Sequence, residues 1–208
     1  MKNKLRRASQ RGVGFWMAMA FVGLWVTLAC GWLAGARLNV TASLPIGLYW
    51  TVPLSLERDS YVRFCPPAYG AFVTAHDRGY LGSGNCDSGY THMLKRVAGI
   101  DGEHVDVRSI ATWIDGKPLK LSTQLTADPG GRIMPRPAHD HYVLQPTQLW
   151  VVSDTNPLSF DSRYFGPIDK SWISETVRPV LTWGKGGTVA QWRQRVAEKL
   201  VTHPTQSP

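Results

Sequence analysis

The sequence predicts a mostly β domain that follows a single N-terminal membrane-spanning helix. Residues 13–36 form an apolar run without charge, and this run exceeds the ~20 residues that a helix needs to cross a bilayer. Residues 37–184 contain short β-type runs separated by Gly, Pro, Asn and Asp. Only residues 185–208 place apolar side chains at helical spacing, which favours a short C-terminal helix.

The composition is that of an ordinary globular chain. Hydrophobic residues make up 43% and charged residues 18% of the 208 residues, which excludes a largely disordered protein. The formal net charge of +8 raises the question of a nucleic-acid partner. Outside the first 11 residues, however, the basic residues are spread along the chain, and no nucleic-acid-reading motif accompanies them. We therefore expect no nucleic-acid partner.

The N-terminal flank of the apolar run predicts how the chain lies across a membrane. Its basic side chains are Lys2, Lys4, Arg6, Arg7 and Arg11, and the other flank is much less basic. This asymmetry predicts that residues 1–12 are cytoplasmic, that residues 13–36 are a single-pass anchor in membrane lipid, and that the domain of residues 37–184 lies outside the cytoplasm.

A cleaved signal peptide is the alternative to an anchor, because Ala34-Gly35-Ala36 resembles a small-x-small cleavage site. The length of the apolar run favours the anchor, since the core of a signal peptide spans ~7–15 residues. Both alternatives place the domain in the same compartment.

The strands of the domain are expected at residues 61–64, 71–74, 93–100, 105–107, 142–144, 149–152 and 177–183. Residues 111–119 predict a β-hairpin, because Asp115-Gly116 is a favoured two-residue turn. Turn-forming and small residues surround Ser43 throughout residues 37–53. The polar residues 122–139, rich in Pro and Gly, predict a long surface loop.

The cysteines and histidines predict a disulfide and no metal site or other cofactor. Cys30 lies in the apolar run, whereas Cys65 and Cys86 lie in the exported part, where disulfides persist. We expect a Cys65–Cys86 bridge; two buried thiols are the alternative, and zinc is disfavoured because no Cys-x-x-Cys spacing occurs. His139-Asp140-His141 is the tightest histidine group, but two ligands from neighbouring loop positions do not make a metal site.

Three segments carry side chains that core packing does not require. Ser43 lies in the turn-rich stretch, and residues 153–166 combine hydroxyls, carboxylates and one arginine. Lys95 lies in an apolar run, where burial disfavours the ammonium form and makes a lysine a general base near neutral pH. Each segment has a structural alternative: a turn serine, a lysine that points outward, and a solvated loop with an Asp–Arg pair.

Together and in this order, the three segments resemble the type I signal peptidases. The patterns are Ser-x-Pro-x-Gly, then Lys-Arg-Val-x-Gly, then Ser-Asp-x-Asn-x-x-Ser-x-Asp-Ser-Arg-Tyr-x-Gly. The most specific pieces are Lys-Arg-Val-Ala-Gly-Ile-Asp-Gly-Glu at residues 95–103 and Asp-Ser-Arg-Tyr-Phe-Gly at residues 161–166. The resemblance extends from the anchor to Pro167. It implies a signal-peptidase-like antiparallel β domain that is periplasmic and anchored in the bacterial inner membrane.

The departures from that pattern resemble one subfamily. Ordinary signal peptidases have Ser-Met-x-Pro-Thr at the nucleophile, whereas residues 43–49 read Ser-Leu-Pro-Ile-Gly-Leu-Tyr. The shortened Ser-x-Pro spacing, the Gly-x-Tyr and the Cys65-Pro66-Pro67 loop are similar to the TraF-type peptidases of conjugative transfer systems. Those enzymes process pilin precursors, and some join the new end to form a cyclic pilin.

The resemblance implies a role for each matching residue. Ser43 would be the nucleophile and Lys95 its general base, a variant of the triad logic. The Ser43 backbone N–H and the Thr41 hydroxyl would hold the oxyanion, and one such donor is worth about 3–4 kcal/mol.

The third segment would support these groups. Ser159 would orient the lysine, and Asp161 and Arg163 would form a supporting ion pair. Ser153 stands where the family usually has glycine, which leaves the backbone geometry there open.

The implied function is processing of a pilin precursor, or of another exported membrane protein, by a serine–lysine endopeptidase. The resemblance leaves hydrolysis and cyclisation open, because either water or an amine resolves an acyl-enzyme. The alternatives are a general type I signal peptidase and a non-catalytic pilus or transfer assembly protein, in which Ser43 and Lys95 would be replaceable.

Overall fold

The structure is a computed structural model that describes residues 2–153 and 155–184. Its helices are α1 (Lys2–Leu33), α2 (Ala71–Asp77), α3 (Ser162–Phe165) and the 3-10 turn η1 (Lys170–Trp172). Its strands are β1 (Ala36–Asn39), β2 (Ile46–Val52), β3 (Tyr61–Phe64), β4 (Met93–Gly99), β5 (His104–Val107), β6 (Thr112–Ile114), β7 (Lys117–Pro118), β8 (His141–Val143), β9 (Gln148–Val152), β10 (Ile168–Asp169) and β11 (Ile173–Gly184). The chain divides between Arg37 and Leu38 into two compact units.

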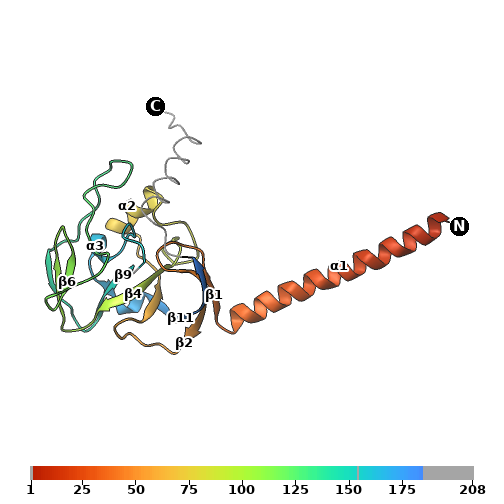
Figure 1. The fold of residues 1–208 in the computed structure, drawn as a ribbon, viewed down its shortest axis with the longest axis horizontal. Helices are drawn as coiled ribbons and strands as arrows, with labels where there is room; N and C mark the ends of the chain where they lie inside the picture. Colours follow the sequence, from red (N-terminus) through yellow and green to blue (C-terminus); the bar gives the residue numbers. More distant parts are fainter. Residues whose placement is uncertain (1, 154, 185–208) are drawn as a thin grey trace. The chain divides into compact units, whose positions relative to one another are not determined.

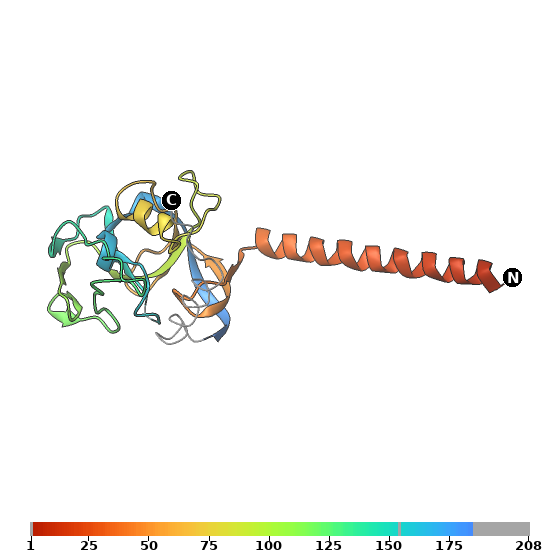
Figure 2. The ribbon, with the colours of Figure 1, turned by 90° about the horizontal axis from the view of Figure 1, so that it is seen from above.

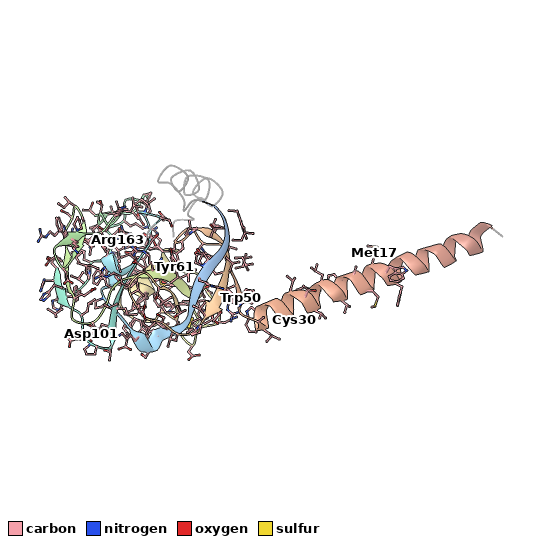
Figure 3. All side chains as sticks on the ribbon, turned by 60° about the horizontal axis from the view of Figure 1, so that its bottom comes forward. Met17, Cys30, Trp50, Tyr61, Asp101 and Arg163 are labelled. Atoms are coloured by element: carbon pink, nitrogen blue, oxygen red, sulfur yellow. A yellow bond between two sulfur atoms is a disulfide. The ribbon has the colours of Figure 1, made fainter. Side chains whose placement is uncertain are left out.

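The first unit consists chiefly of α1. Within this helix, Gly14–Leu33 is long and apolar enough to cross a membrane. Its large apolar side chains, such as Trp16 and Leu24, are more than half exposed in the isolated chain, and Figure 3 shows Met17 and Cys30 on the same helix. A single N-terminal apolar helix of this kind fits a single-pass membrane anchor.

The second unit is mostly antiparallel β-structure, as the sequence predicts. Seven strands form one sheet in the order β1-β2-β11-β3-β4-β9-β10, and four form a smaller sheet in the order β7-β6-β5-β8. The long β11 pairs antiparallel with both β2 and β3, so the last strand of the second unit lies between two of its early strands (Figures 1 and 2). One apolar cluster joins β3, β4 and β9 to α2 and α3, and a second joins β5 and β6 to β9.

The hairpin prediction is confirmed, whereas the strand predicted at residues 71–74 is wrong. Asp115 and Gly116 take positive φ angles of 47° and 73° between β6 and β7, which is the geometry of a tight hairpin turn. Residues 71–74 instead begin the helix α2, because Phe72 and Ala75 are buried at i, i+3 spacing. A four-residue window of β-forming side chains hides this longer helical pattern.

Residues 122–139 form no helix or strand, but they are not only surface. Ser122, Gln124 and Met134 are buried, and the Gln124 side chain donates a hydrogen bond to the Arg163 carbonyl. The Ser122 hydroxyl likewise accepts from the Thr112 N–H and donates to the Leu119 carbonyl, so both buried polar side chains have backbone partners. The C-terminal helix expected at residues 185–208 lies outside the described residues.

A disulfide joins Cys65 at the end of β3 to Cys86 in the loop that precedes β4. The two cysteines are 21 residues apart, so the bridge closes the segment that contains α2. Bridges of this kind form and persist in oxidising compartments.

Candidate active site

The structure brings together Ser43, Lys95 and Ser159, which come from three separate segments. Lys95 Nζ lies 2.7 Å from Ser43 Oγ and 2.7 Å from Ser159 Oγ. The two hydroxyl oxygens lie 3.4 Å apart. Ser43 lies in the turn between β1 and β2, Lys95 in β4, and Ser159 in the loop between β9 and α3. Two hydroxyl groups and one amine are therefore within hydrogen-bond reach of one another.

The position of Lys95 in the sheet explains its burial. β4 lies between β3 and β9, and Lys95 is paired with Val62 of β3. Lys95 is 1% exposed, while the next residue, Arg96, is half-buried and forms an ion pair with Asp59 on the outer face. Successive side chains of a strand point to opposite faces, so only one of the two basic residues enters the site.

Burial lowers the pKa of Lys95 to about 8 from its usual 10.5. Desolvation of the ammonium is the largest cause; the nearby Asp161 carboxylate raises the pKa, and the Arg163 guanidinium lowers it. At pH 7 about one tenth of a group with this pKa is a neutral amine. The site therefore holds an amine that can accept a proton near neutral pH.

Asp161 and Arg163 form an ion pair that is fully buried. Arg163 Nε donates to Asp161 Oδ1 at 2.7 Å, and the second guanidinium arm donates to Oδ2 at 2.8 Å. Arg163 also donates to backbone carbonyls of four neighbouring loop residues: Leu121, Thr123, Pro157 and Ser159. Figure 3 shows Arg163 within the body of the domain. The guanidinium thereby ties the Ser159 loop to residues 121–123.

Side chains, rather than a β-ladder, hold the turn that carries Ser43. Asn39 is buried, and its Nδ2 donates to the carbonyls of Thr41, Leu44 and Pro45 at 3.1–3.2 Å. The buried Tyr49 hydroxyl donates to the Pro45 carbonyl at 2.8 Å. The chain needs these contacts because backbone carbonyls that leave water must find donors.

Gly47 of the Ser-x-Pro-x-Gly pattern allows β2 to approach β11. A Cβ at this position would lie 2.2 Å from the Leu181 carbonyl oxygen, well inside van der Waals contact. The glycine is therefore a packing requirement directly after the turn.

A family of known proteins matches this chain over most of its length. Residues 10–183 match the family model described as signal peptidase, peptidase S26. The chain belongs to the peptidase S26 family. The family resemblance that the sequence motifs indicate is thereby confirmed.

Curated relatives of the chain carry a transfer-protein name. Two proteins from Escherichia coli, each named plasmid transfer protein TraF, are 42% and 43% identical over 167 and 152 residues. These alignments cover 80% and 73% of this chain, and 94% and 86% of the relatives. A solved signal peptidase I from Enterococcus faecalis V583 is 18% identical, with a TM-score of 0.38, and the match covers 61% of this chain and all of that one. A likeness this distant adds no argument.

Thr41, the expected second oxyanion donor, is engaged elsewhere in this S26 chain. Its hydroxyl donates to Asn39 Oδ1 at 2.8 Å, and its backbone N–H donates to the same oxygen at 3.2 Å. The side chain is exposed. A Thr41 hydroxyl that serves an oxyanion has to leave Asn39 first.

Sequence reasoning missed Asn39 and Gln124, and it left the role of Ser153 open. Asn39 lies in a stretch of turn formers, where an asparagine is ordinary. Gln124 lies in a polar loop, where a glutamine is expected to be solvated. Of these three residues, only Ser153 stands out in the sequence, because it replaces the glycine that the family usually has at this position.

Among the described residues, one cluster of three potential metal ligands is present, formed by Cys65, Cys86 and His92. Both sulfur atoms belong to the disulfide, and a disulfide sulfur is not the thiolate that binds a metal. His141 is exposed and contacts Asp106 at 2.8 Å.

Proposed function

We propose that this chain is a membrane-anchored serine endopeptidase in which Ser43 is the nucleophile and Lys95 the general base. The observation that carries the proposal is the 2.7 Å contact between Ser43 Oγ and the Nζ of a lysine that is 1% exposed. Ser43 itself is only half-buried, so a peptide can reach it. Membership of a peptidase family supports the same conclusion.

In the proposed reaction, neutral Lys95 accepts the hydroxyl proton while Ser43 Oγ forms a bond to the scissile carbonyl carbon. Ser159, at 2.7 Å from Nζ, accepts a hydrogen bond from the amine and keeps its lone pair directed at Ser43. The Ser43 N–H, joined by Thr41 if it leaves Asn39, stabilises the oxyanion. As the C–N bond breaks, Lys95 returns the proton to the leaving amine. Water or another amine then resolves the acyl-enzyme, with Lys95 again as the base.

The proposed substrate is a pilin precursor, or another exported membrane protein of a conjugative transfer system. The support is the name of the relatives, plasmid transfer protein TraF, together with the shared Ser-x-Pro-x-Gly-x-Tyr pattern of TraF-type peptidases. An exported precursor approaches a membrane-anchored peptidase along the same bilayer, which raises its local concentration.

We further propose that the N-terminus is cytoplasmic and that the domain is periplasmic, against the membrane. The basic N-terminal flank supports this orientation, and the Cys65–Cys86 bridge supports an oxidising compartment. Leu38, Val40 and Trp183 are 60–70% exposed in the second unit. Exposed apolar side chains of this size are suited to contact with lipid.

The test is processing of a pilin precursor of a conjugative transfer system, in membranes that contain the full chain. Ser43→Ala and Lys95→Ala are compared with Ser109→Ala and Lys117→Ala, which make the same changes at exposed positions. Mass spectrometry identifies the products, and hydrolysis and cyclisation differ by the mass of one water. We expect both site variants to leave the precursor uncut and both controls to process it.

Two other outcomes would each support one of the alternative functions. Continued processing by both site variants contradicts the peptidase proposal and leaves the transfer assembly protein. Ser43-dependent cleavage of an ordinary secreted preprotein, at the same rate as the pilin precursor, indicates a general signal peptidase.

A further inference from the structure

Ser153 is a buried serine that forms hydrogen bonds with both Ser43 and Asp161 of the candidate site. It follows β9 directly and is 1% exposed. Its hydroxyl donates a short hydrogen bond to the carbonyl oxygen of Ser43 and accepts one from the Asn156 backbone N–H at 3.0 Å. Its own N–H donates to Asp161 Oδ2 at 3.1 Å. One residue therefore links the nucleophile to the carboxylate that acts on Lys95.

The backbone at Ser153 does not require the glycine that the family usually has there. The non-glycine residues with positive φ in the described chain are Asp59, Asp115 and Leu121. Ser153 is not among them, so a serine fits this position without backbone strain. The replacement adds a hydroxyl that glycine lacks, and the hydroxyl has both a donor and an acceptor partner.

The Ser43 carbonyl receives little help from elsewhere among the described residues. The other hydrogen bond to it comes from the Thr155 hydroxyl at 3.4 Å, which is close to the limit for such a bond. Asn39 and Tyr49 hold the carbonyls on either side of Ser43, but not its own. The peptide unit between Ser43 and Leu44 is thus oriented chiefly by Ser153.

We propose that Ser153 is a positioning residue, which fixes Ser43 Oγ relative to Lys95 Nζ. The inference rests on the proposed function, because it assigns Ser153 a role in the same serine–lysine reaction. Without the hydroxyl, the Ser43 carbonyl and the Asn156 N–H lose their partner, and the turn is free to rotate about Ser43. A displacement of ~1 Å at a reacting atom lowers a rate by about 100-fold.

The test measures kcat and KM of the full chain in detergent, with a peptide spanning the cleavage site of the pilin precursor. We expect Ser153→Ala and Ser153→Gly each to lower kcat by about 10- to 100-fold with KM changed less than about threefold. The pH midpoint of activity should stay in place, because both variants keep the backbone N–H that binds Asp161.

Ser162→Ala is the matched control. Ser162 is also fully buried beside β9, but its hydroxyl accepts from the Val151 N–H and does not contact Ser43. We expect this variant to lose thermal stability as Ser153→Ala does, while its kcat stays within about twofold of wild type.

Two results overturn the inference: a wild-type kcat in Ser153→Ala or Ser153→Gly, or an equal loss of kcat in Ser162→Ala. Ser43→Ala, assayed in parallel, separates this failure from failure of the proposed function. If Ser43→Ala still cleaves the peptide, the serine–lysine reaction is wrong, and the positioning role falls with it. If Ser43→Ala is inactive while Ser153→Ala is fully active, only the positioning role is wrong.

Discussion

Ser43 and Lys95 lie in two regions of the molecule that are held in different ways. The turn around Ser43 depends on single side chains, since Asn39, Tyr49 and Ser153 each bind its backbone carbonyls. Lys95 lies in β4, in the middle of a sheet, where it is paired with Val62 of β3 and where β9 pairs with β4 from Arg96 onward. The turn leaves its serine half-buried, whereas the sheet removes its lysine from water.

This difference shows where each region is vulnerable. A strand in the middle of a sheet keeps its backbone hydrogen bonds when one side chain is lost. A charged side chain that the sheet buries, however, lowers the free energy of unfolding. A turn held by side chains carries no such charge, but each side chain it loses leaves carbonyls without donors. We therefore expect charge changes to dominate stability near Lys95, and hydrogen-bond changes to dominate near Ser43.

The largest effect is expected from Arg163→Met, on the lysine side. The substitution leaves the fully buried Asp161 without its partner, which should lower the free energy of unfolding by about 3–5 kcal/mol. The control is Arg108→Met at the Asp106–Arg108 pair, in which the Arg108 side chain is 60% exposed and the Asp106 side chain 34% exposed. That loss should be about 1 kcal/mol. Urea unfolding in detergent measures both, and equal losses would contradict the account.

The next effect is expected from Lys95→Met, and it depends on pH. The folded-state pKa of Lys95 is about 8 and its usual value is 10.5, so the unfolded chain binds more protons between these values. Wild-type stability should therefore rise with pH across this window, and below about pH 8 the wild type should carry a penalty of about 3 kcal/mol.

Lys95→Met lacks this penalty. It should be inactive yet more stable than wild type at pH 7, and the difference should disappear by about pH 10.5. Thermal unfolding from pH 7 to pH 10.5 measures the difference. A difference that stays constant over this range would argue against the buried ammonium.

The smallest effect is expected on the turn side. Asn39→Ala removes the donor to three carbonyls and should lower the free energy of unfolding by about 1–3 kcal/mol, with a loss of kcat. Asn39→Asp keeps an acceptor for Thr41 but turns a carboxylate toward the same three carbonyls, so it should be no better than alanine. Unfolding and peptide cleavage measure both variants. If Asn39→Asp has the stability and kcat of the wild type, the donated hydrogen bonds do not hold the turn.

The sequence predicted the mostly β domain, the hairpin at Asp115-Gly116 and the apolar helix, because each has a local signal. Alternating runs, a favoured turn dipeptide and a long uncharged segment are visible within a few residues. Lys95 had a local signal, a lysine within an apolar run, whereas the roles of Ser43 and Ser159 came only from the family resemblance. Their convergence depends on pairing between distant strands, which no local pattern contains.

What remained unpredicted depends on tertiary contacts. Asn39 and Gln124 look like solvated turn and loop residues, and the partners that bury them lie as far as Arg163, 39 residues from Gln124. Helix α2 looked like a strand because the burial of Phe72 and Ala75 is decided by the sheet they pack on. Propensity is a weak prior where tertiary packing decides.

The measurement that tests the central claim most directly is the pH dependence of kcat/KM for cleavage of the precursor peptide by the wild-type chain. If neutral Lys95 is the base, kcat/KM should rise about tenfold per pH unit on the acid side and level off above a midpoint near the Lys95 pKa of about 8. A kcat/KM that is constant from about pH 6 to pH 9 would contradict the account, because a base with this pKa changes its protonation across that range.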